Sequence, residues 1–515
     1  MEAVEKETDL FRFFQTLDLA PPPVAKRRRK AKAEPAAAPP TAMASLSKLF
    51  ASECFRHLCA EITGCGELDD RVDLSSQVYA RGGHLLCHDD VIGTRKISFI
   101  YYLTDPEEEW SVVEGGALEL YPPDPEAPPG TPSACPTTEL LPLSDSLALF
   151  VVEPGVSFHA VREVRGGRAR MSIQGWLHAP SLDLTQGFER RSVATLQQLL
   201  AAKAPAVAPP RREAEAPAAP ASLSAADRAV LSRWLSAEYL EGAPAAVSER
   251  FAKASYALLT AFLRADVAEE ILGALAAADE ADGFGRGEEP EVPRYDAGAA
   301  GGWTLVGPPH LRRYLRYAAG TDDSLGRPLQ RLREELLSTE AFRQWLRLCT
   351  GLEPRSPRSA EIRRFRPGLD YTVAARAPTA EGDDYELDVT MMFVARGAEA
   401  AEQWASEEVG GFDSYLEADD ERDESVEAQE VYRGSDEGPL VNLPATCNAL
   451  ALVMRDAKTL RFVKYLSRDA PSSRVDVIMS YGVDAPEGSS GEEGEGEGAV
   501  EAAADVHALE SAPVS

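Results

Sequence analysis

Short apolar and β-branched runs, separated by turn residues, dominate residues 78–180. The runs read RKISFIYYLT, GALELY, SLALFVVE and RARMSIQGWLH, and turns such as GG, PPDP and EPG lie between them. Many short strands at this spacing are typical of an antiparallel β-sandwich or jelly roll, because each turn brings the chain back to the same sheet. We therefore predict a mainly β domain in this part of the chain.

The pattern becomes helical after Ser224. The letters SAAD offer a capping box before RAVLSRWLSAEYL, and apolar residues recur at helical spacing over residues 248–279 and 338–352. Strand-like runs resume over residues 361–481. The chain is therefore predicted to contain two β regions joined by helices.

The second β region repeats the first. SFIYYLTD has a counterpart in VTMMFVAR, EGGALELY in VGGFDSYL, and LPLSDSLALFVVEPGVSFHAV in VNLPATCNALALVMRDAKTLRFV. Each match is weak alone, but the order and the approximate spacing are kept. We infer two copies of one β-domain.

Composition narrows the possible partners. The 515 residues carry a net charge of −31, which argues against non-specific binding to bare nucleic acid or an anionic membrane and is compatible with a basic protein partner. The longest stretches of acid lie in residues 419–424 and 487–505, where solvated disordered acid is expected. A membrane span is not expected, because no run of eighteen apolar residues occurs.

Two further patterns bear on the cellular compartment. Seven scattered cysteines without a CxxC pair indicate a reducing compartment. The run KRRRK at residues 26–30 reads either as a nuclear-import signal or as a solvated basic loop. We expect the protein in the nucleus and the cytoplasm.

The stretch GGHLLCHDDVIGTR, residues 82–95, contains the candidate metal ligands. Alternation along a strand would place His88 and Asp90 on one face and Asp89 on the other. A third ligand, His159 in PGVSFHAV, would complete a two-histidine, one-carboxylate set, which leaves positions on ferrous iron open for a cosubstrate and dioxygen. Arg170 follows eleven residues later and could bind a dicarboxylate through a bidentate pair.

Other interpretations of this stretch are weaker. An isolated HxD is more often structural than metal-binding, and only its combination with the later histidine and arginine favours a metal. His84 and His88 would share a helix face, as in zinc-binding HExxH motifs, but the glutamate is absent and GG precedes the segment. Cys87 is expected in the core.

The motifs LLCHDD, SFIYYLTD, VSFHAV and MSIQGWLHAPSL resemble those of the 2-oxoglutarate- and iron-dependent prolyl 3-hydroxylases that modify a ribosomal protein near the decoding centre. The resemblance runs from about Leu10 to Tyr481. It implies that His88, Asp90 and His159 bind Fe(II), and that Arg170, Tyr102 and Tyr79 bind 2-oxoglutarate. Dioxygen would be the second cosubstrate and L-ascorbate the reductant.

The resemblance also implies two tandem double-stranded β-helix domains, of which the second is degenerate and binds no metal. Aligning FRPGLDYTVAA with YARGGHLLCHDD leaves no ligand in the second copy, places Arg461 opposite His159, and places Arg474 near the counterpart of Arg170. The expected divisions are a partly disordered lead with the basic run (1–44), a catalytic domain (45–185), a linker and helical connection (186–300), a metal-free domain (301–482) and an acidic disordered tail (483–515).

The function implied is hydroxylation of carbon 3 of a prolyl residue in a basic small-subunit ribosomal protein, with an effect on translation. Two alternatives stay open. The chain could be an oxygen-sensing scaffold that binds a transcription factor or its inhibitor, or an iron oxygenase with another protein substrate.

Overall fold

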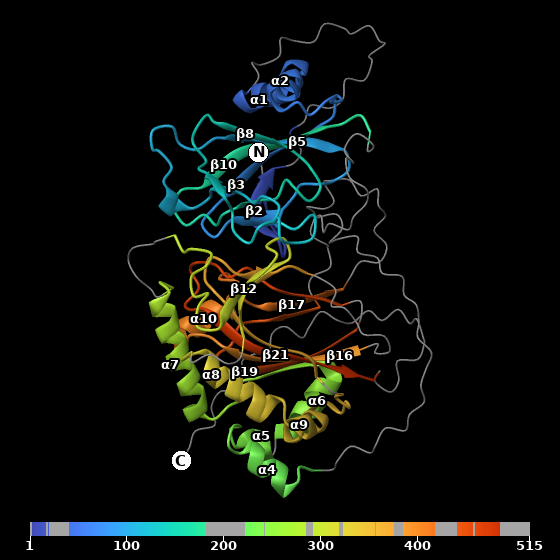
Figure 1. Ribbon diagram of the computed structural model, residues 1–515, viewed down its shortest axis with the longest axis vertical. Coiled ribbons are helices and arrows are strands. Elements are labelled where there is room, and N and C mark those ends of the chain that lie inside the picture. The colour runs from blue at the N-terminus through green and yellow to red at the C-terminus, as the bar shows by residue number, and fades with distance from the viewer. Residues whose placement is uncertain are drawn as a thin grey trace.

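Two β-domains are stacked along the long axis of the molecule in the computed structural model (Figure 1). The structure describes residues 3–16, 19, 41–181, 222–241, 243–284, 292–318, 323–355, 357–374, 385–417, 440–456 and 459–484. The basic run, the Pro/Ala-rich segment at 203–221 and the acidic stretches lie outside these residues, so the predictions for them are untested. No described helix is long and apolar enough to cross a membrane.

The N-terminal domain is one curled sheet of ten antiparallel strands in the order β7-β6-β9-β4-β2-β3-β10-β5-β8, with β1 paired to β2. Its strands are β1 (Ala3–Glu7), β2 (Phe11–Thr16), β3 (Val72–Tyr79), β4 (His84–His88), β5 (Arg95–Tyr102), β6 (Leu118–Leu120), β7 (Thr138–Leu140), β8 (Leu147–Val151), β9 (His159–Val161) and β10 (Arg170–His178). The apolar core inside the curl includes Tyr79, Leu118 and Val161. A short 3-10 turn, η1 (Val112–Glu114), precedes β6.

Two helices cover the outer face of this sheet. Helix α1 (Ala42–Phe50) begins after a Thr41 cap and α2 (Glu53–Thr63) after a Ser52 cap. Their aromatic residues Phe50 and Phe55 pack on Phe99 of β5, with ring centroids 5.2 and 5.1 Å apart. Burial of these rings attaches the helix pair to the sheet.

The C-terminal domain has a main sheet in the order β11-β19-β16-β21-β14-β13-β12, with β15 paired to β13, and a small sheet in the order β18-β17-β20. Its strands are β11 (Tyr256–Leu259), β12 (Trp303–Val306), β13 (Arg312–Tyr317), β14 (Pro357–Phe365), β15 (Tyr371–Thr372), β16 (Tyr385–Phe393), β17 (Asp413–Glu417), β18 (Val441–Leu443), β19 (Ala449–Asp456), β20 (Thr459–Val463) and β21 (Arg474–Val483). Its helices are α4 (Ala225–Leu231), α5 (Glu238–Glu241), α6 (Ala243–Ala254), α7 (Ala265–Ala281), α8 (Gly326–Leu332), a π-helical turn η3 (Arg333–Leu337), α9 (Glu340–Thr350) and α10 (Ala398–Ala405).

The strand registers confirm the internal repeat. In the first copy Arg170 lies opposite Tyr79, and in the second Arg474 lies opposite Phe365. Each copy also contains a Gly-Gly pair, at residues 115–116 and 410–411. The backbone carbonyl of the second glycine, Gly116 or Gly411, accepts a hydrogen bond from the arginine of its own copy. The repeat extends further than the sequence indicated. The hairpin β1–β2 occupies the place that β12–β13 occupies in the second copy.

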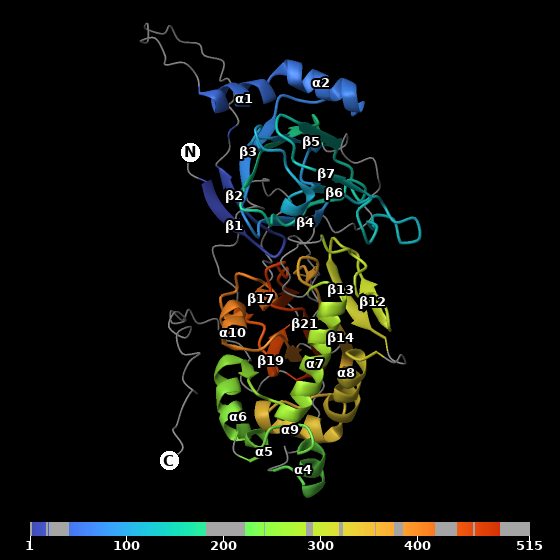
Figure 2. The ribbon, with the colours of Figure 1, turned by 90° about the vertical axis from the view of Figure 1, so that its left-hand side faces the viewer.

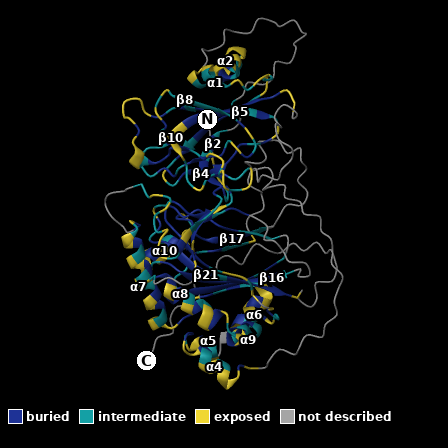
Figure 3. Ribbon diagram, viewed as in Figure 1, coloured by how far each residue is buried: buried dark blue, intermediate teal, exposed yellow. Residues whose placement is uncertain are grey.

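Two segments lie elsewhere than expected. The lead includes strands β1 and β2, which pair with the catalytic sheet through β3 and β4. Helices from the expected connection share one apolar core with the C-terminal sheet, where Leu231 and Ile271 cluster with Val389 and Val477. Figure 3 shows this buried layer between the helices and the sheet. The connection is therefore part of the C-terminal domain, because its apolar helix faces need a sheet to cover them.

The two domains meet on the β4 side of the N-terminal domain (Figure 2), and buried polar contacts connect them. Glu163 is buried and accepts hydrogen bonds from the Ser467 hydroxyl and from the backbone N–H of Arg468 at 2.9 Å. At the edge, Arg81 forms an ion pair with Asp469 at 2.5 Å. The second copy thus packs against the outside of the strands that carry the candidate ligands.

Candidate metal centre

A bulge in β4 decides which side chains face the interior of the N-terminal domain. Leu85 pairs with Val161 and His88 with His159, so three steps on β4 match two steps on β9. The extra residue reverses the alternation, and His88 therefore lies on the inner face like Leu85. His84 lies on the outer face, where its ring contacts Tyr465 of the other domain at 4.3 Å. A helical His84–His88 pair does not form.

The Asp90 carboxylate lies beside His88 and His159, but its backbone is not part of a strand as expected. Strand β4 ends at His88, and Asp90 has a left-handed backbone with φ of 61°. Asp90 therefore does not follow the predicted strand alternation, because it lies beyond the end of β4. Asp89 does point elsewhere: its carboxylate accepts a hydrogen bond from the backbone N–H of Gly155, in the turn before β9.

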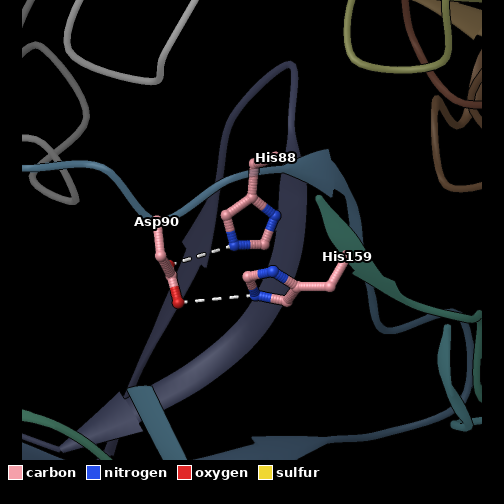
Figure 4. Close-up of side chains that lie close together, drawn as sticks. All are labelled: His88, Asp90 and His159. Atoms are coloured by element: carbon pink, nitrogen blue, oxygen red, sulfur yellow. Dashed lines mark ion pairs between the residues drawn. The ribbon is translucent and has the colours of Figure 1, made fainter. Parts of the chain in front are cut away.

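The three predicted ligands lie together, as Figure 4 shows. One ligand atom from each of His88, Asp90 and His159 lies within 4.8 Å of the others, and all three residues are buried. His88 Nε2 lies 3.2 Å from Asp90 Oδ1, and His159 Nε2 lies 3.4 Å from Asp90 Oδ2. His88 Nε2, Asp90 Oδ1 and His159 Nε2 are buried and have no hydrogen-bond partner among the described residues.

The hydrogen bonds on the other ring nitrogens prepare both histidines for a metal. His88 Nδ1 lies 2.8 Å from the Leu86 carbonyl, and His159 Nδ1 lies 2.8 Å from the Ser157 carbonyl. A carbonyl only accepts, so each Nδ1 carries the proton and each Nε2 presents a lone pair. Two imidazole lone pairs and one carboxylate around a common point are the ligands that ferrous iron prefers.

The electrostatics of the group favour a cation. Burial alone would raise the pKa of Asp90, but His159 and His88 together hold it well below its usual range. Burial alone would lower the pKa of His159, yet Asp90 raises it above its usual range. The carboxylate therefore attracts positive charge to this point, and a divalent metal would satisfy the same demand.

A second group of predicted residues surrounds Arg170. Its guanidinium carbon lies 4.8 Å from the ring centroid of Tyr79 and 5.0 Å from that of Tyr102. Arg170 Nη2 and Tyr102 Oη are buried without a hydrogen-bond partner, and no described carboxylate pairs with the arginine. A buried guanidinium without an anion is costly. The residues therefore fit a ligand that brings a carboxylate, as the distal end of 2-oxoglutarate would.

Known proteins are similar to this chain in sequence. The family described as "2OG-Fe(II) oxygenase superfamily" matches residues 74–178, and "Oxoglutarate and iron-dependent oxygenase degradation C-term" matches residues 226–489. The chain is 36% identical over 488 residues to the prolyl 3,4-dihydroxylase OGFOD1 of Ostreococcus tauri, covering 92% of this chain and 89% of the relative. The chain belongs to the 2-oxoglutarate- and iron(II)-dependent oxygenases.

Two other similarities accompany this one. The oxygenase is 28% identical over 512 residues to the prolyl 3-hydroxylase OGFOD1 of Xenopus laevis, covering 91% of this chain and 80% of the relative. A solved prolyl-4-hydroxylase from Pseudomonas putida is 20% identical, with a TM-score of 0.24, and covers 35% of this chain and 79% of its own.

The second copy of the oxygenase fold has the corresponding positions filled by ion pairs. Arg474 donates hydrogen bonds to Asp413 at 2.5 Å and to Asp476 at 2.9 Å, so its charge is neutralised within the protein. Arg461 lies at the register position of His159 and pairs with Asp413 at 2.6 Å. The segment FRPGLDYTVAA, which aligns with YARGGHLLCHDD, contains no histidine. This donor set does not fit iron.

Two residues that hold Asp90 in place are not evident from the sequence pattern. The indole Nε1 of Trp176 donates a hydrogen bond to Asp90 Oδ2 at 3.0 Å, and Arg95 lies over the same indole with its guanidinium carbon 3.5 Å from the ring centroid. Both side chains are buried. The six-residue spacing of Trp176 from Arg170 on one strand was the available signal, because an even spacing places both on the inner face.

Proposed function

We propose that this oxygenase hydroxylates carbon 3 of a prolyl residue in a basic protein of the small ribosomal subunit and so affects translation. The observation that carries the catalytic part is the buried group of His88, Asp90 and His159, beside an arginine for which the described residues supply no carboxylate partner. The prolyl part is supported by the similarity over most of the chain to relatives named prolyl 3-hydroxylase.

The residues of the chain bind and orient the reactants. Iron(II), bound with 2-oxoglutarate and dioxygen, supplies the oxidising power to hydroxylate an unactivated C–H bond, with succinate and carbon dioxide as coproducts and L-ascorbate keeping the metal reduced. His88, Asp90 and His159 hold the metal, while Arg170 and Tyr102 fix the far end of the cosubstrate. The buried setting of all five residues excludes water from the reacting atoms. No side chain needs to act as a general base.

The basic substrate is supported by charge. The chain has 84 acidic and 53 basic residues, giving a net charge of −31. Such a surplus attracts a basic polypeptide over long range and repels the phosphates of ribosomal RNA. The substrate would therefore be recognised as a free protein or as a segment projecting from the subunit.

Mass spectrometry of small-subunit proteins tests the proposal. Cells with and without this chain are compared, and cells carrying His88→Ala serve as the control for a scaffold role. We expect one prolyl residue to carry the mass of an added oxygen atom only where the intact chain is present. If the residue is modified to the same extent in all three, the proposed substrate is wrong.

Succinate release in vitro separates an enzyme from a pure scaffold. Purified chain with Fe(II), 2-oxoglutarate and ascorbate should release more succinate when a peptide containing the prolyl residue is added. If succinate release is instead unchanged by every prolyl peptide and increased by another protein, that result would favour an oxygenase with a different substrate.

We also propose that the protein divides between nucleus and cytoplasm. The support is the basic run at residues 26–30, which suits a nuclear-import receptor. A fluorescent fusion with these five residues replaced by alanine should lose its nuclear fraction, and an unchanged distribution would leave the run as a solvated loop.

A further inference from the structure

The two oxygens of the Asp90 carboxylate have different surroundings. Oδ2 accepts a hydrogen bond from the Trp176 indole at 3.0 Å. Oδ1 lies 3.2 Å from His88 Nε2 and has no hydrogen-bond partner among the described residues. The indole therefore distinguishes the oxygens, occupying one and leaving the other to a metal.

The backbone of Asp90 makes this support necessary. Its φ of 61° is uncommon for a residue with a side chain, and the residue lies beyond the end of β4. No strand partner fixes its position, in contrast to His88, which pairs with His159. Trp176 lies within β10 and pairs with Asp73 of β3 and Ser98 of β5. A side chain from the middle of the sheet thus holds a ligand from a loop.

Arg95 strengthens the indole as a donor. Its guanidinium carbon lies 3.5 Å from the centroid of the Trp176 ring, and its charge is partly balanced by Asp73 at 3.4 Å. A cation over the face of an indole draws electron density from the ring, which makes the N–H more acidic and its hydrogen bond shorter. The contacts therefore form a series from Asp73 through Arg95 and Trp176 to Asp90.

We propose that Trp176 is a positioning residue for the metal centre: its N–H fixes Asp90 so that Oδ1 is the ligand, and Arg95 acts on the metal only through the indole. This inference rests on the metal site of the proposed function but not on the identity of the substrate. A hydrogen bond to a metal-binding carboxylate typically contributes a factor of about 10–100 to metal affinity.

The test measures metal binding rather than turnover. The full-length apo chain is titrated with Mn(II), and the free ion is followed by electron paramagnetic resonance. Trp176 is replaced by benzothienylalanine, an isostere with sulfur in place of the N–H, and in a second variant by Phe. We expect the dissociation constant to rise about tenfold or more in both. The unfolding temperature of the isosteric chain should stay close to that of the parent.

Trp303 supplies a matched control. Its indole also donates to a carboxylate, Asp323 Oδ1 at 2.9 Å, but it lies in the C-terminal domain. The same isosteric replacement there should leave Mn(II) affinity unchanged. An equal loss at both tryptophans, or no loss at Trp176, would overturn the proposal. Failure of the parent chain to bind Mn(II) would instead overturn the metal site of the proposed function.

A double-mutant cycle tests the role of Arg95. Arg95→Met should weaken Mn(II) binding in the parent chain and have no further effect in the Trp176→Phe chain, because the guanidinium then has no indole N–H to act on. Independent, additive losses would overturn the part of the proposal that concerns Arg95.

Discussion

Arg461 lies in the second copy at the register position that His159 occupies in the first. His159 pairs with Leu120 across β6, and Arg461 pairs with Tyr415 across the corresponding strand β17. The replacement exchanges a predicted metal ligand for a fixed positive charge, which Asp413 and Asp388 balance at 2.6 and 3.3 Å. The polar side chains inside the first copy are therefore available to bind ligands, which we call an open centre. Those inside the second copy pair with one another, which we call a closed centre.

Replacement of Arg170 by Met should remove cosubstrate binding while leaving the metal ligands in place. Loss of one partner of a buried charge pair costs about 2–5 kcal/mol, so the KM for 2-oxoglutarate should rise roughly 30-fold or more. The apo chain should melt at a higher temperature, because an unpaired buried charge has been removed. Steady-state kinetics and calorimetry measure the two effects. Mn(II) affinity that falls to the same extent would show damage to the whole centre instead.

The same substitution at Arg474 should have the opposite effect on stability. Arg474→Met leaves Asp413 and Asp476 buried with one cation fewer, and breaking a buried pair in this way costs about 3–5 kcal/mol. Urea unfolding of the two variants measures the contrast. Equal effects of the two substitutions would contradict the distinction between an open and a closed centre.

Metal binding should depend on His88 and Asp90 and not on His84. The variants His88→Ala and Asp90→Ala should lose turnover and the thermal stabilisation by Mn(II), since each removes a ligand. His84→Ala is the control, because the His84 ring lies against Tyr465 on the outer face. It should keep Mn(II) stabilisation. Loss of binding in His84→Ala would favour the zinc-type histidine pair.

Acid should weaken the C-terminal domain through its buried aspartates. Burial alone would raise the pKa of Asp413, but Arg461 and Arg474 hold it far below its usual range. A lowered folded-state pKa stabilises the protein above the unfolded value of about 4, and this stability is lost as pH falls through the folded-state pKa. Unfolding free energy should thus decline below about pH 4, more steeply in the parent than in Asp413→Asn. Asp70→Asn, at an exposed site, should keep the parental slope.

Most of the candidate site could be predicted from the types of residue in the sequence. Few side chains serve as metal or carboxylate ligands, so the sequence pointed to His88, Asp90, His159 and Arg170. The Gly-Gly pair of each copy indicated how the two copies align. The hairpin β1–β2 was missed, because Phe11–Thr16 is short and the strands through which the hairpin joins the sheet, β3 and β4, begin more than fifty residues later. Docking of the helices on the C-terminal sheet depends on tertiary contacts that periodicity does not specify.

The backbone features that bring the candidate ligands together could not be predicted from the sequence pattern. Regular alternation groups His84 with His88 and His88 with Asp90, whereas the structure separates the first pair and joins the second through a non-strand residue. A bulge and a left-handed residue each change the direction of a side chain without a clear signature in the letters. The role of Trp176 was equally inaccessible from the sequence, because it depends on Asp90 lying next to its indole inside the curled sheet.

The bulge in β4 sets how the centre responds to a change in chain length. With one residue deleted between Leu85 and His88, two steps on β4 would match two steps on β9, and regular alternation would keep His88 on the inner face opposite His159. With two residues deleted, a single step would remain, and alternation would turn either Leu85 or His88 outward. The ligand set should therefore survive the loss of one codon between these residues and be lost with the second.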